Sequence, residues 1–460
     1  MQSSRYLKTI AAVLLGLSTS FALADNGPVP STDTAPQSAA QPMLVPSPPN
    51  VPAKAYVLMD VDSGKIIAEK NMDERRAPAS LTKLMTLYLT SRALHAGVIK
   101  TSDKVLISKK AWQTGGSRMF VKVNSQVPVD MLTQGIIVDS GNDATMALAQ
   151  FVGGSIPSFV QMMNQQAQAL GMKNTHYTDP TGLPAPKHYS SAHDLGILAR
   201  AIWLEFPEYH AWYGEKWLTY NNIRQPNRNR LLWRYPYAKG MKTGHTDEAG
   251  YCLIAEADKN GMRLISVVMG APTDEDRSSD SIRLLEYGFR FYNTHLLYQG
   301  GSVVATPRIW FGDKSSIPAG VLDSFYVTMP HGQFQKAKVN VQMDTNIHAP
   351  IAKGQQLGTV TVSVDGNVVE TRPLVALEAD SKGGWWRYST DAVGYKFHQW
   401  FGSKDETVKV AKPADTPAPA AQTQPAPTAA DASTNQADAS IATGQNGNPP
   451  APSIANAGKK

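Results

Sequence analysis

Apolar positions between residue 45 and about residue 293 alternate between helical spacing and short strand-like runs. From Ser80 to His95 apolar residues recur every three or four positions, after Pro78 and before Gly97, which predicts a buried helix. Helices around an antiparallel sheet are the natural packing for the full order of elements, so we expect an α+β domain over 45–293. The same patterns predict further helices over 143–151, 158–170, 192–205 and 278–292, and strands over 251–257 and 263–269.

A different pattern follows from residue 296 to residue 378, where short runs of β-forming residues are separated by turn residues. Residues 324–328, 338–341 and 358–364 are expected to be strands, with turns at His331-Gly332 and Asp365-Gly366. We therefore expect a small all-β domain over 296–378, acting as a spacer and not in catalysis.

Residues 383–402 contain several large aromatic side chains in an amphipathic pattern. Such a helix would suit a bilayer surface, so we predict attachment to a membrane surface through 383–402. The alternative is a terminal helix docked on the second domain. One side of the helix would carry Trp386, Val393, Phe397 and Trp400, and the residues away from it would be Arg387, Asp391 and His398.

The two ends of the chain differ in composition from the middle. Residues 1–24 combine Arg5 and Lys8 with an apolar run and the small-x-small sequence Ala22-Leu23-Ala24, which is typical of a secretory signal peptide. An uncleaved anchor is the alternative. Residues 25–44 and 411–460 are rich in Pro, Ala, Ser, Thr and Gln, so we expect a disordered leader and a disordered tail in an exported protein.

Composition narrows the class of protein further. The 460 residues are 42% hydrophobic and 18% charged, which is enough for at least one substantial core and for two domains. The formal charge of +6 is mild and no basic run is dense, so we expect no nucleic-acid partner. The single cysteine, Cys252, cannot form an internal disulfide and is expected in the core. The ten histidines show no metal-ligand spacing, so we expect no metal and no cofactor.

Three short motifs carry the candidate chemistry. Ser80 and Lys83 share a face of the first predicted helix, and the unpaired N–H groups and dipole of its first turn favour negative charge at Ser80. A serine hydroxyl is a poor nucleophile until a base takes its proton, so Lys83 must be neutral. Each motif alone recurs by chance, but their order and settings together predict a serine acyl-transfer site. The motifs are Ser80-Leu81-Thr82-Lys83, Ser140-Gly141-Asn142 and Lys242-Thr243-Gly244.

A neutral Lys83 requires a large change in the pKa of its amine. A free lysine has a pKa of roughly 10.4, so function near neutrality requires a fall of about 3, on the order of 4 kcal/mol. Burial and a second cation both disfavour the ammonium form, and we expect Lys242 to be that cation.

The other two motifs have expected roles around the same serine. Ser140 and Asn142 lie on a turn, where a hydroxyl and an amide could relay a proton to the leaving amine and hold Lys83 in place; a simple helix cap is the alternative. Because Gly244 has no side chain, its backbone can lie close to a substrate, and the N–H groups of Ser80 and His245 are then expected to form an oxyanion hole.

Together these motifs resemble those of the low-molecular-mass penicillin-binding proteins, which are D-alanyl-D-alanine carboxypeptidases of the serine peptidase S11 type. The resemblance spans roughly residues 45–402. It implies a β-lactamase/transpeptidase-like first domain, an antiparallel sheet with helices, followed by the small all-β domain. Further matching segments are a hairpin over 55–69, Thr181-Gly182-Leu183, 240–251 and 288–292.

The resemblance also implies a reaction. Ser80 would attack the penultimate D-alanine of a peptidoglycan stem pentapeptide, release the terminal D-alanine and form an acyl-enzyme that water hydrolyses. β-Lactam antibiotics would acylate the same serine. Lys242, Thr243 and Arg277 would bind the terminal carboxylate beside Gly244 and His245; a solvated surface arginine in an acidic loop is the alternative for Arg277. The family implies a role in cell wall biogenesis and cell shape at the periplasmic face of the inner membrane.

Two other functions stay open. A β-lactamase would use the same motifs, but no glutamate motif of the class A kind stands between Ser140 and Lys242, which argues against fast antibiotic hydrolysis. Some relatives carry histidine where this chain has Thr181, which bears on deacylation. The other function is that of a catalytically silent envelope-binding protein that keeps the fold.

Overall fold

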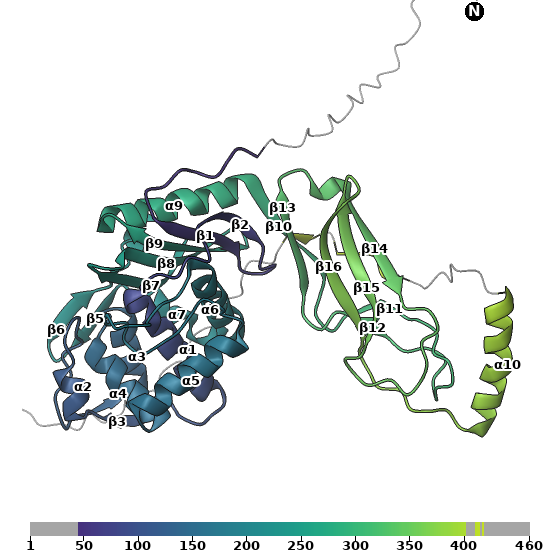
Figure 1. Cartoon of the computed structure of the whole chain (residues 1–460), viewed down its shortest axis with the longest axis horizontal. Coiled ribbons are helices and arrows are strands. Elements are labelled where there is room, and N and C mark those ends of the chain that lie inside the picture. The colour runs from purple at the N-terminus through teal and green to yellow at the C-terminus, as the bar shows by residue number, and fades with distance from the viewer. Residues whose placement is uncertain (1–44, 402–409, 415, 418–460) are drawn as a thin grey trace, which may run out of the picture. The chain divides into compact units, whose positions relative to one another are not determined.

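The computed structural model describes residues 45–401, 410–414 and 416–417 (Figure 1). The predicted signal peptide over 1–24, the leader over 25–44 and most of the tail predicted over 411–460 lie outside the described residues.

The first domain is built on a five-stranded antiparallel sheet in the order β2-β1-β9-β8-β7. The first and last parts of the domain meet at its centre, because β1 pairs with β9. Strand β7 is an edge, so one side of its backbone is free to face something other than the sheet. The strands are β1 Ala55–Asp60, β2 Ile66–Lys70, β7 Ala238–Thr246, β8 Gly250–Lys259 and β9 Met262–Ala271.

Helices cover both faces of this sheet (Figure 1). On one face, Leu284 and Leu285 of helix α9 pack against alternate residues of β8 and β9 such as Leu253 and Leu264. On the other face, the residues between them, such as Ile254, belong to a larger core shared with α1 and α6. The α+β class predicted from the sequence is confirmed by this arrangement. The longer helices are α1 Lys83–His95, α3 Val129–Ile137, α4 Asn142–Gly153, α5 Ile156–Ala169, α6 Ala192–Glu205 and α9 Asp274–Phe291.

Three of the longer helices start with a capping side chain. Ser155, Ser191 and Thr273 directly precede α5, α6 and α9, and their side-chain oxygens each accept a hydrogen bond from a backbone N–H three residues later.

Short elements connect the layers of the domain. The smaller elements are α2 Lys109–Gln113, α7 His210–Tyr213, α8 Leu231–Arg234, the 3₁₀ turn η2 Pro207–Tyr209, and the hairpins of β3 Lys104–Leu106 with β4 Gln126–Pro128 and of β5 Trp217–Tyr220 with β6 Ile223–Pro226.

The segment predicted as one helix over 80–95 differs from the prediction at its start. It opens with the 3₁₀ turn η1 Ala79–Thr82, and the α-helix begins only at Lys83. Ala79 has a positive φ of 47°, so the chain bends sharply directly before Ser80. Side chains at i and i+3 eclipse one another in a 3₁₀ turn, so Ser80 and Lys83 project from the same side of the chain.

The second part of the chain is all-β, as the spacing of turn residues predicted. One sheet has the order β11-β12-β16-β15-β14 and another has the order β13-β10-β17. Alternate residues of β15, such as Val360 and Val362, enter its core with Phe325 and Leu374. The elements are β10 Tyr292–Tyr298, β11 Val303–Ala305, β12 Ala319–Gly320, β13 Phe325–Pro330, η3 Phe334–Lys336, β14 Ala337–Met343, β15 Gln356–Val364, β16 Asn367–Ala376 and β17 Thr416–Pro417.

Residues after the second domain form helix α10, Trp385–Phe401. Farther on, the first described residues of the segment predicted as a tail contact the second domain: Ala411 N donates to Val304 O, and β17 pairs with β10. Throughout the described ranges, the structure contains no helix with the length and apolar character that crossing a bilayer requires.

Candidate active site

The three motifs come together from distant parts of the first domain. Ser80 lies in η1, Ser140 lies on the turn between α3 and α4, and Lys242 to Gly244 lie on the edge strand β7. Together they surround a cleft of about 430 Å³. Six residues that the sequence singled out line this cleft, namely Ser80, Ser140, Thr243, Gly244, His245 and Arg277.

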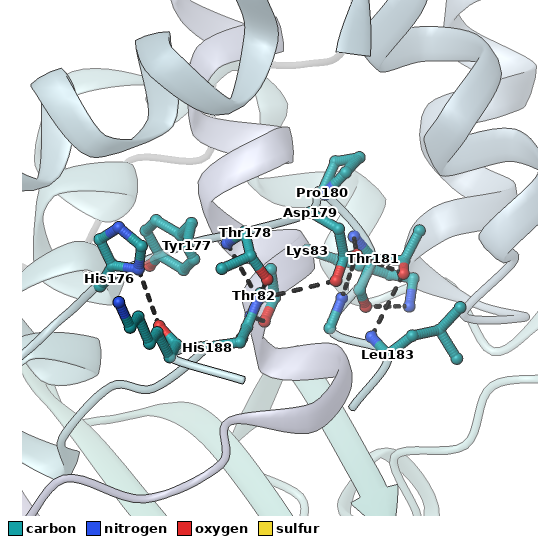
Figure 2. Close-up of polar contacts among 12 residues, drawn as sticks. Thr82, Lys83, His176, Tyr177, Thr178, Asp179, Pro180, Thr181, Leu183 and His188 are labelled. Carbon is teal, nitrogen blue, oxygen red and sulfur yellow. Dashed lines mark hydrogen bonds and ion pairs between the residues drawn. The ribbon is translucent and has the colours of Figure 1, made fainter. Parts of the chain in front are cut away.

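Ser80 and Lys83 are in direct contact. Lys83 Nζ donates hydrogen bonds to Ser80 Oγ at 2.7 Å and to the carbonyl oxygen of Thr181 at 2.7 Å. The Lys83 side chain is completely buried, and the loop that carries Thr181 lies beside it in Figure 2. The amine is therefore held at the serine oxygen by the 3₁₀ turn on one side and by a loop 98 residues away on the other.

Burial sets the protonation of Lys83. It lowers the pKa of the Lys83 amine to about 7, with the charge of Arg228 acting in the same direction and those of Asp179 and Asp143 acting against it. A substantial fraction of the amine is therefore unprotonated near neutral pH. In that form Lys83 can accept the proton of Ser80 Oγ.

Ser140 is in contact with the second lysine. Lys242 Nζ donates to Ser140 Oγ at 2.9 Å and to the carbonyl oxygen of Thr243 at 2.9 Å. Ser140 itself has a positive φ of 58°, which turns its hydroxyl into the cleft from the start of α4. Burial and then the charge of Lys83 hold the pKa of Lys242 well below its usual value. A proton on one of these two amines disfavours a proton on the other.

Arg228 is a cation of the site that sequence reasoning missed. Its Nε donates to the backbone carbonyl of Asp139 at 3.1 Å, directly before Ser140, and its charge lowers the pKa of both lysines. Burial raises the pKa of the neighbouring Asp139 to about 7. The sequence expectation assigned the second cation to Lys242 alone. The only sequence signal for Arg228 is its place in the polar run Asn227-Arg228-Asn229, whose two asparagines are buried.

Asn142 makes a different contact from the one the sequence suggested. Its Nδ2 donates to the carbonyl oxygen of Gly115 at 2.6 Å, and its backbone N–H donates to Ser117 O at 2.8 Å. Asn142 therefore holds the loop at 115–117, whose Ser117 also lines the cleft. The carbonyl of Thr181 takes the part in holding Lys83 that was expected of the turn at 140–142.

The edge strand β7 lies directly against the serine turn. A Cβ atom at Gly244 would stand 3.1 Å from Ser80 N and 3.2 Å from Leu81 N, so a side chain there would meet the backbone of η1. This close approach brings the backbone of His245 to the same end of the cleft as Ser80. The His245 ring packs on Tyr251, with 4.0 Å between ring centroids.

Arg277 lies in the first turn of α9 and not in a loop. Its side chain is 8% exposed, so the alternative of a solvated surface arginine is wrong. One guanidinium nitrogen, Nη1, donates to the carbonyl oxygens of Gly244 at 3.1 Å and Cys252 at 3.3 Å, and the other, Nη2, pairs with Asp274. The cation is thus fixed behind β7 with access to the cleft.

Comparisons with known proteins agree with this architecture. Residues 42–273 match the family model described as D-alanyl-D-alanine carboxypeptidase, and residues 292–382 match the one described as penicillin-binding protein 5, C-terminal domain. The chain is 46% identical to D-alanyl-D-alanine carboxypeptidase DacC of Escherichia coli strain K12 over 77% of this chain and 91% of that protein. It is 43% identical to DacA of the same organism, over 78% of this chain and 91% of the relative.

A solved structure gives the same result. Penicillin-binding protein 5 of Haemophilus influenzae is 43% identical, covers 73% of this chain and 99% of its own, and superposes with a TM-score of 0.69. Both domains are thus matched by one known group of serine peptidases, and the chain belongs to the D-alanyl-D-alanine carboxypeptidase family.

Proposed function

We propose that this carboxypeptidase removes the terminal D-alanine from peptidoglycan stem pentapeptides through an acyl-enzyme on Ser80. The observation that carries the proposal is the 2.7 Å hydrogen bond from Lys83 Nζ to Ser80 Oγ, made by a buried amine whose pKa is lowered to about 7. Such an amine is a base of suitable strength for a serine hydroxyl at neutral pH.

Acylation would proceed with a balanced proton transfer. Lys83 takes the proton of Ser80 Oγ as the oxygen attacks the carbonyl carbon of the penultimate D-alanine. The N–H groups of Ser80 and His245 stabilise the oxyanion. As the C–N bond breaks, Ser140 passes a proton to the leaving amine of D-alanine and receives one from Lys242, which contacts its hydroxyl. Ser80 then carries the acyl group as an ester.

The free carboxylate at the substrate terminus would be bound at the wall of the cleft that β7 forms. Arg277 is buried with its guanidinium beside Gly244 and supplies a fixed positive charge, and the Thr243 hydroxyl supplies a hydrogen-bond donor at the same wall. Lys242 adds a positive field whenever it is protonated. A terminal carboxylate is thus favoured over an internal peptide bond, which is the preference of a carboxypeptidase.

Water completes the cycle. After the leaving amine has departed, Lys83 still holds the proton of Ser80 and Lys242 has given one up, so transfer of that proton from Lys83 to Lys242 makes Lys83 neutral again. Lys83 contacts the oxygen of Ser80 that becomes the ester oxygen, and it is assigned as the base for the water that hydrolyses the ester. β-Lactam antibiotics carry a reactive amide and a carboxylate at comparable positions, so we assign their acylation to the same serine.

The experiment that tests the proposal is intact-protein mass spectrometry during exposure to penicillin, combined with release of free D-alanine from a pentapeptide. The wild type should gain one penicillin mass that maps to Ser80 and should release D-alanine, whereas Ser80→Ala should do neither. Ser158→Ala, an exposed serine at the start of α5, is the matched control and should behave as the wild type. Rapid loss of the added mass without D-alanine release would identify a β-lactamase, and penicillin binding without either turnover would identify a silent binding protein.

We also propose that the enzyme is exported and attached peripherally at the periplasmic face of the inner membrane, where it acts in cell wall biogenesis and cell shape. Helix α10 supports the attachment, because Trp385 and Trp386 are 70% and 76% exposed, and Val393 and Phe397 are exposed as well. The opposite side of α10 packs on the second domain through Asp391, which accepts a hydrogen bond from the N–H of Phe311 at 2.9 Å. The helix is therefore both docked and left with an aromatic surface suited to a bilayer interface.

A further inference from the structure

His188 is a buried histidine that the proposed mechanism does not use. It lies on the loop after α5, and its side chain reaches the serine-bearing turn at a residue between Ser80 and Lys83: His188 Nε2 stands 2.8 Å from Thr82 Oγ1 (Figure 2). Thr82 is completely buried and so is not a second nucleophile. The contact therefore holds the structure together and takes no part in the chemistry, but Thr82 is directly next to Lys83, the base of the reaction.

The contacts of the ring define its protonation. The backbone N–H of Thr178 donates to His188 Nδ1 at 3.2 Å, and the Thr178 hydroxyl lies 3.1 Å from the same atom. Nδ1 is therefore the unprotonated nitrogen, and Nε2–H donates to Thr82. Burial lowers the pKa of His188, which keeps the ring neutral; the ionisable groups facing it are Asp179, 3.6 Å away, and His176.

The same loop delivers the carbonyl that holds Lys83. Asp179 Oδ1 accepts hydrogen bonds from Thr181 N and Thr181 Oγ1, both at 2.6 Å, and from Gly182 N at 3.0 Å. This turn directs the carbonyl oxygen of Thr181 to Lys83 Nζ. Backbone bridges tie the base of this loop, between His176 and Tyr189 and between Arg76 and Ser190. Between these bridges the backbone is irregular, so side-chain contacts help to decide where that carbonyl lies.

The loop packs closely against the serine turn. Gly182 has a φ of +84°, and a Cβ atom there would stand 1.8 Å from Ala79 O and 2.8 Å from Thr82 Oγ1. A small movement of the loop away from Thr82 would therefore also move the Thr181 carbonyl away from the amine of Lys83.

We infer that His188 is a positioning residue for acylation: its hydrogen bond to Thr82 holds the loop of Thr181 against the serine turn and so keeps Lys83 aligned with Ser80. His188 is not among the residues that line the cleft, so it acts through Thr82 and the loop. This inference rests on the roles proposed above for Ser80 and Lys83.

The test compares two substitutions at His188 that differ in hydrogen bonding. His188→Gln keeps a donor and an acceptor, whereas His188→Leu keeps volume and removes both. Acylation by a fluorescent penicillin, measured over a range of concentrations, should show that the leucine variant loses about tenfold in the maximal acylation rate constant, equivalent to about 1.4 kcal/mol. The half-saturating concentration should stay unchanged, because His188 does not contact the ligand. The glutamine variant should remain within about twofold of the wild type.

Thr82 gives a second, independent arm should the leucine variant fail to fold. Thr82→Val removes the hydroxyl and should slow acylation as His188→Leu does, while Thr82→Ser should restore the rate. Thr90→Val is the matched control, because Thr90 is also buried on this helical segment but bonds only to the carbonyl oxygen of Thr86. In the double variant with His188→Leu and Thr82→Val the two effects should not add.

Three results would overturn the inference: wild-type acylation in both His188→Leu and Thr82→Val, equal losses in the leucine and glutamine variants, or additive losses in the double variant. Failure of the proposed function is distinguishable from these, because it appears as continued labelling of Ser80→Ala. Loss of labelling in Ser80→Ala together with normal rates in the His188 and Thr82 variants would remove only the positioning role.

Discussion

The cleft of the first domain buries two lysine side chains, whereas helix α10, near the other end of the described chain, exposes two tryptophan side chains to water. Lys83 and Lys242 are at most 1% exposed, and Trp385 and Trp386 are at least 70% exposed. Both observations reverse the ordinary preference of these residue types. Burying an amine and exposing an indole both destabilise the fold, and such arrangements are found where function requires them. The two regions are therefore the parts of the molecule most directly tied to function.

The two reversals differ in their physical consequence. Burial of an amine changes its chemistry, since it lowers the pKa and creates a base. Exposure of an indole changes no chemistry of the ring and instead leaves apolar area available to another surface. The comparison therefore predicts that changes at the cleft alter rates without altering membrane binding, and that changes at α10 do the reverse.

The largest effect is expected from removing the buried amine. Lys83→Met keeps the length of the side chain but has no base to accept the proton of Ser80, so acylation by fluorescent penicillin should fall by about 10³-fold. The variant should bind membrane vesicles as the wild type does. Acylation at a near-normal rate would break the link between burial of this amine and catalysis.

Protonation of the same amine should reproduce much of that loss reversibly. The pKa of Lys83 is lowered to about 7, and only the unprotonated form acts as a base, so acylation should level off above pH 8 and fall as the pH drops through 7. At pH 5 the rate constant should be about 100-fold below its plateau, following a single ionisation with that pKa. The pH dependence of the acylation rate constant checks this, and a flat profile between pH 5 and pH 8 would contradict it.

The exposed tryptophans provide the converse experiment. The double variant with Trp385→Ser and Trp386→Ser should weaken binding to vesicles containing anionic phospholipid by roughly 30-fold, about 2 kcal/mol for two partly inserted rings. Its acylation rate should not change. Trp217→Ser is the control, because this tryptophan is 44% exposed but lies on the β5–β6 hairpin. Equal losses in cosedimentation for the control and the double variant would refute the assignment of the surface to α10.

A smaller effect is expected where β7 meets the serine turn. Gly244→Ala places a Cβ atom 3.1 Å from Ser80 N, so the turn must move by a few tenths of an ångström, and the acylation rate should fall about tenfold through the loss of alignment. Thermal unfolding of the variant should stay close to that of the wild type, since only a local adjustment is needed. An unchanged acylation rate would show that the close approach has no part in positioning Ser80.

The part of the site that follows from local sequence alone is the pair of Ser80 and Lys83, whereas the meeting of the three motifs in one cleft was expected from the resemblance to a known family. Ser80 and Lys83 are three positions apart, so local geometry alone places them together. The contacts of Thr181, Arg228 and His188 could not be predicted, because each depends on tertiary packing. Thr181 and His188 lie on the long loop between α5 and α6, and Arg228 lies in the short connection between β6 and α8. Helical spacing likewise predicted α6 at its observed bounds but not the 3₁₀ turn at Ser80, which depends on the positive φ of Ala79.

The smallest effect sharpens the comparison by testing a buried carboxyl group away from the cleft. Glu256 lies inside β8 with no exposure, neither of its carboxylate oxygens has a hydrogen-bond partner among the described residues, and burial raises its pKa well above the usual value. Its native form is therefore the neutral acid, while the unfolded chain ionises at its ordinary pKa, so the stability it contributes falls as the pH rises between these two values. Glu256→Gln removes this titration and should raise the Tm at pH 8 by roughly 2–4 °C, with a smaller gain at pH 5. A lower Tm at pH 8 would instead mean that Glu256 is ionised and stabilised by Arg263, the opposite charge that lowers its pKa most. A buried charge outside the cleft would then stabilise the fold.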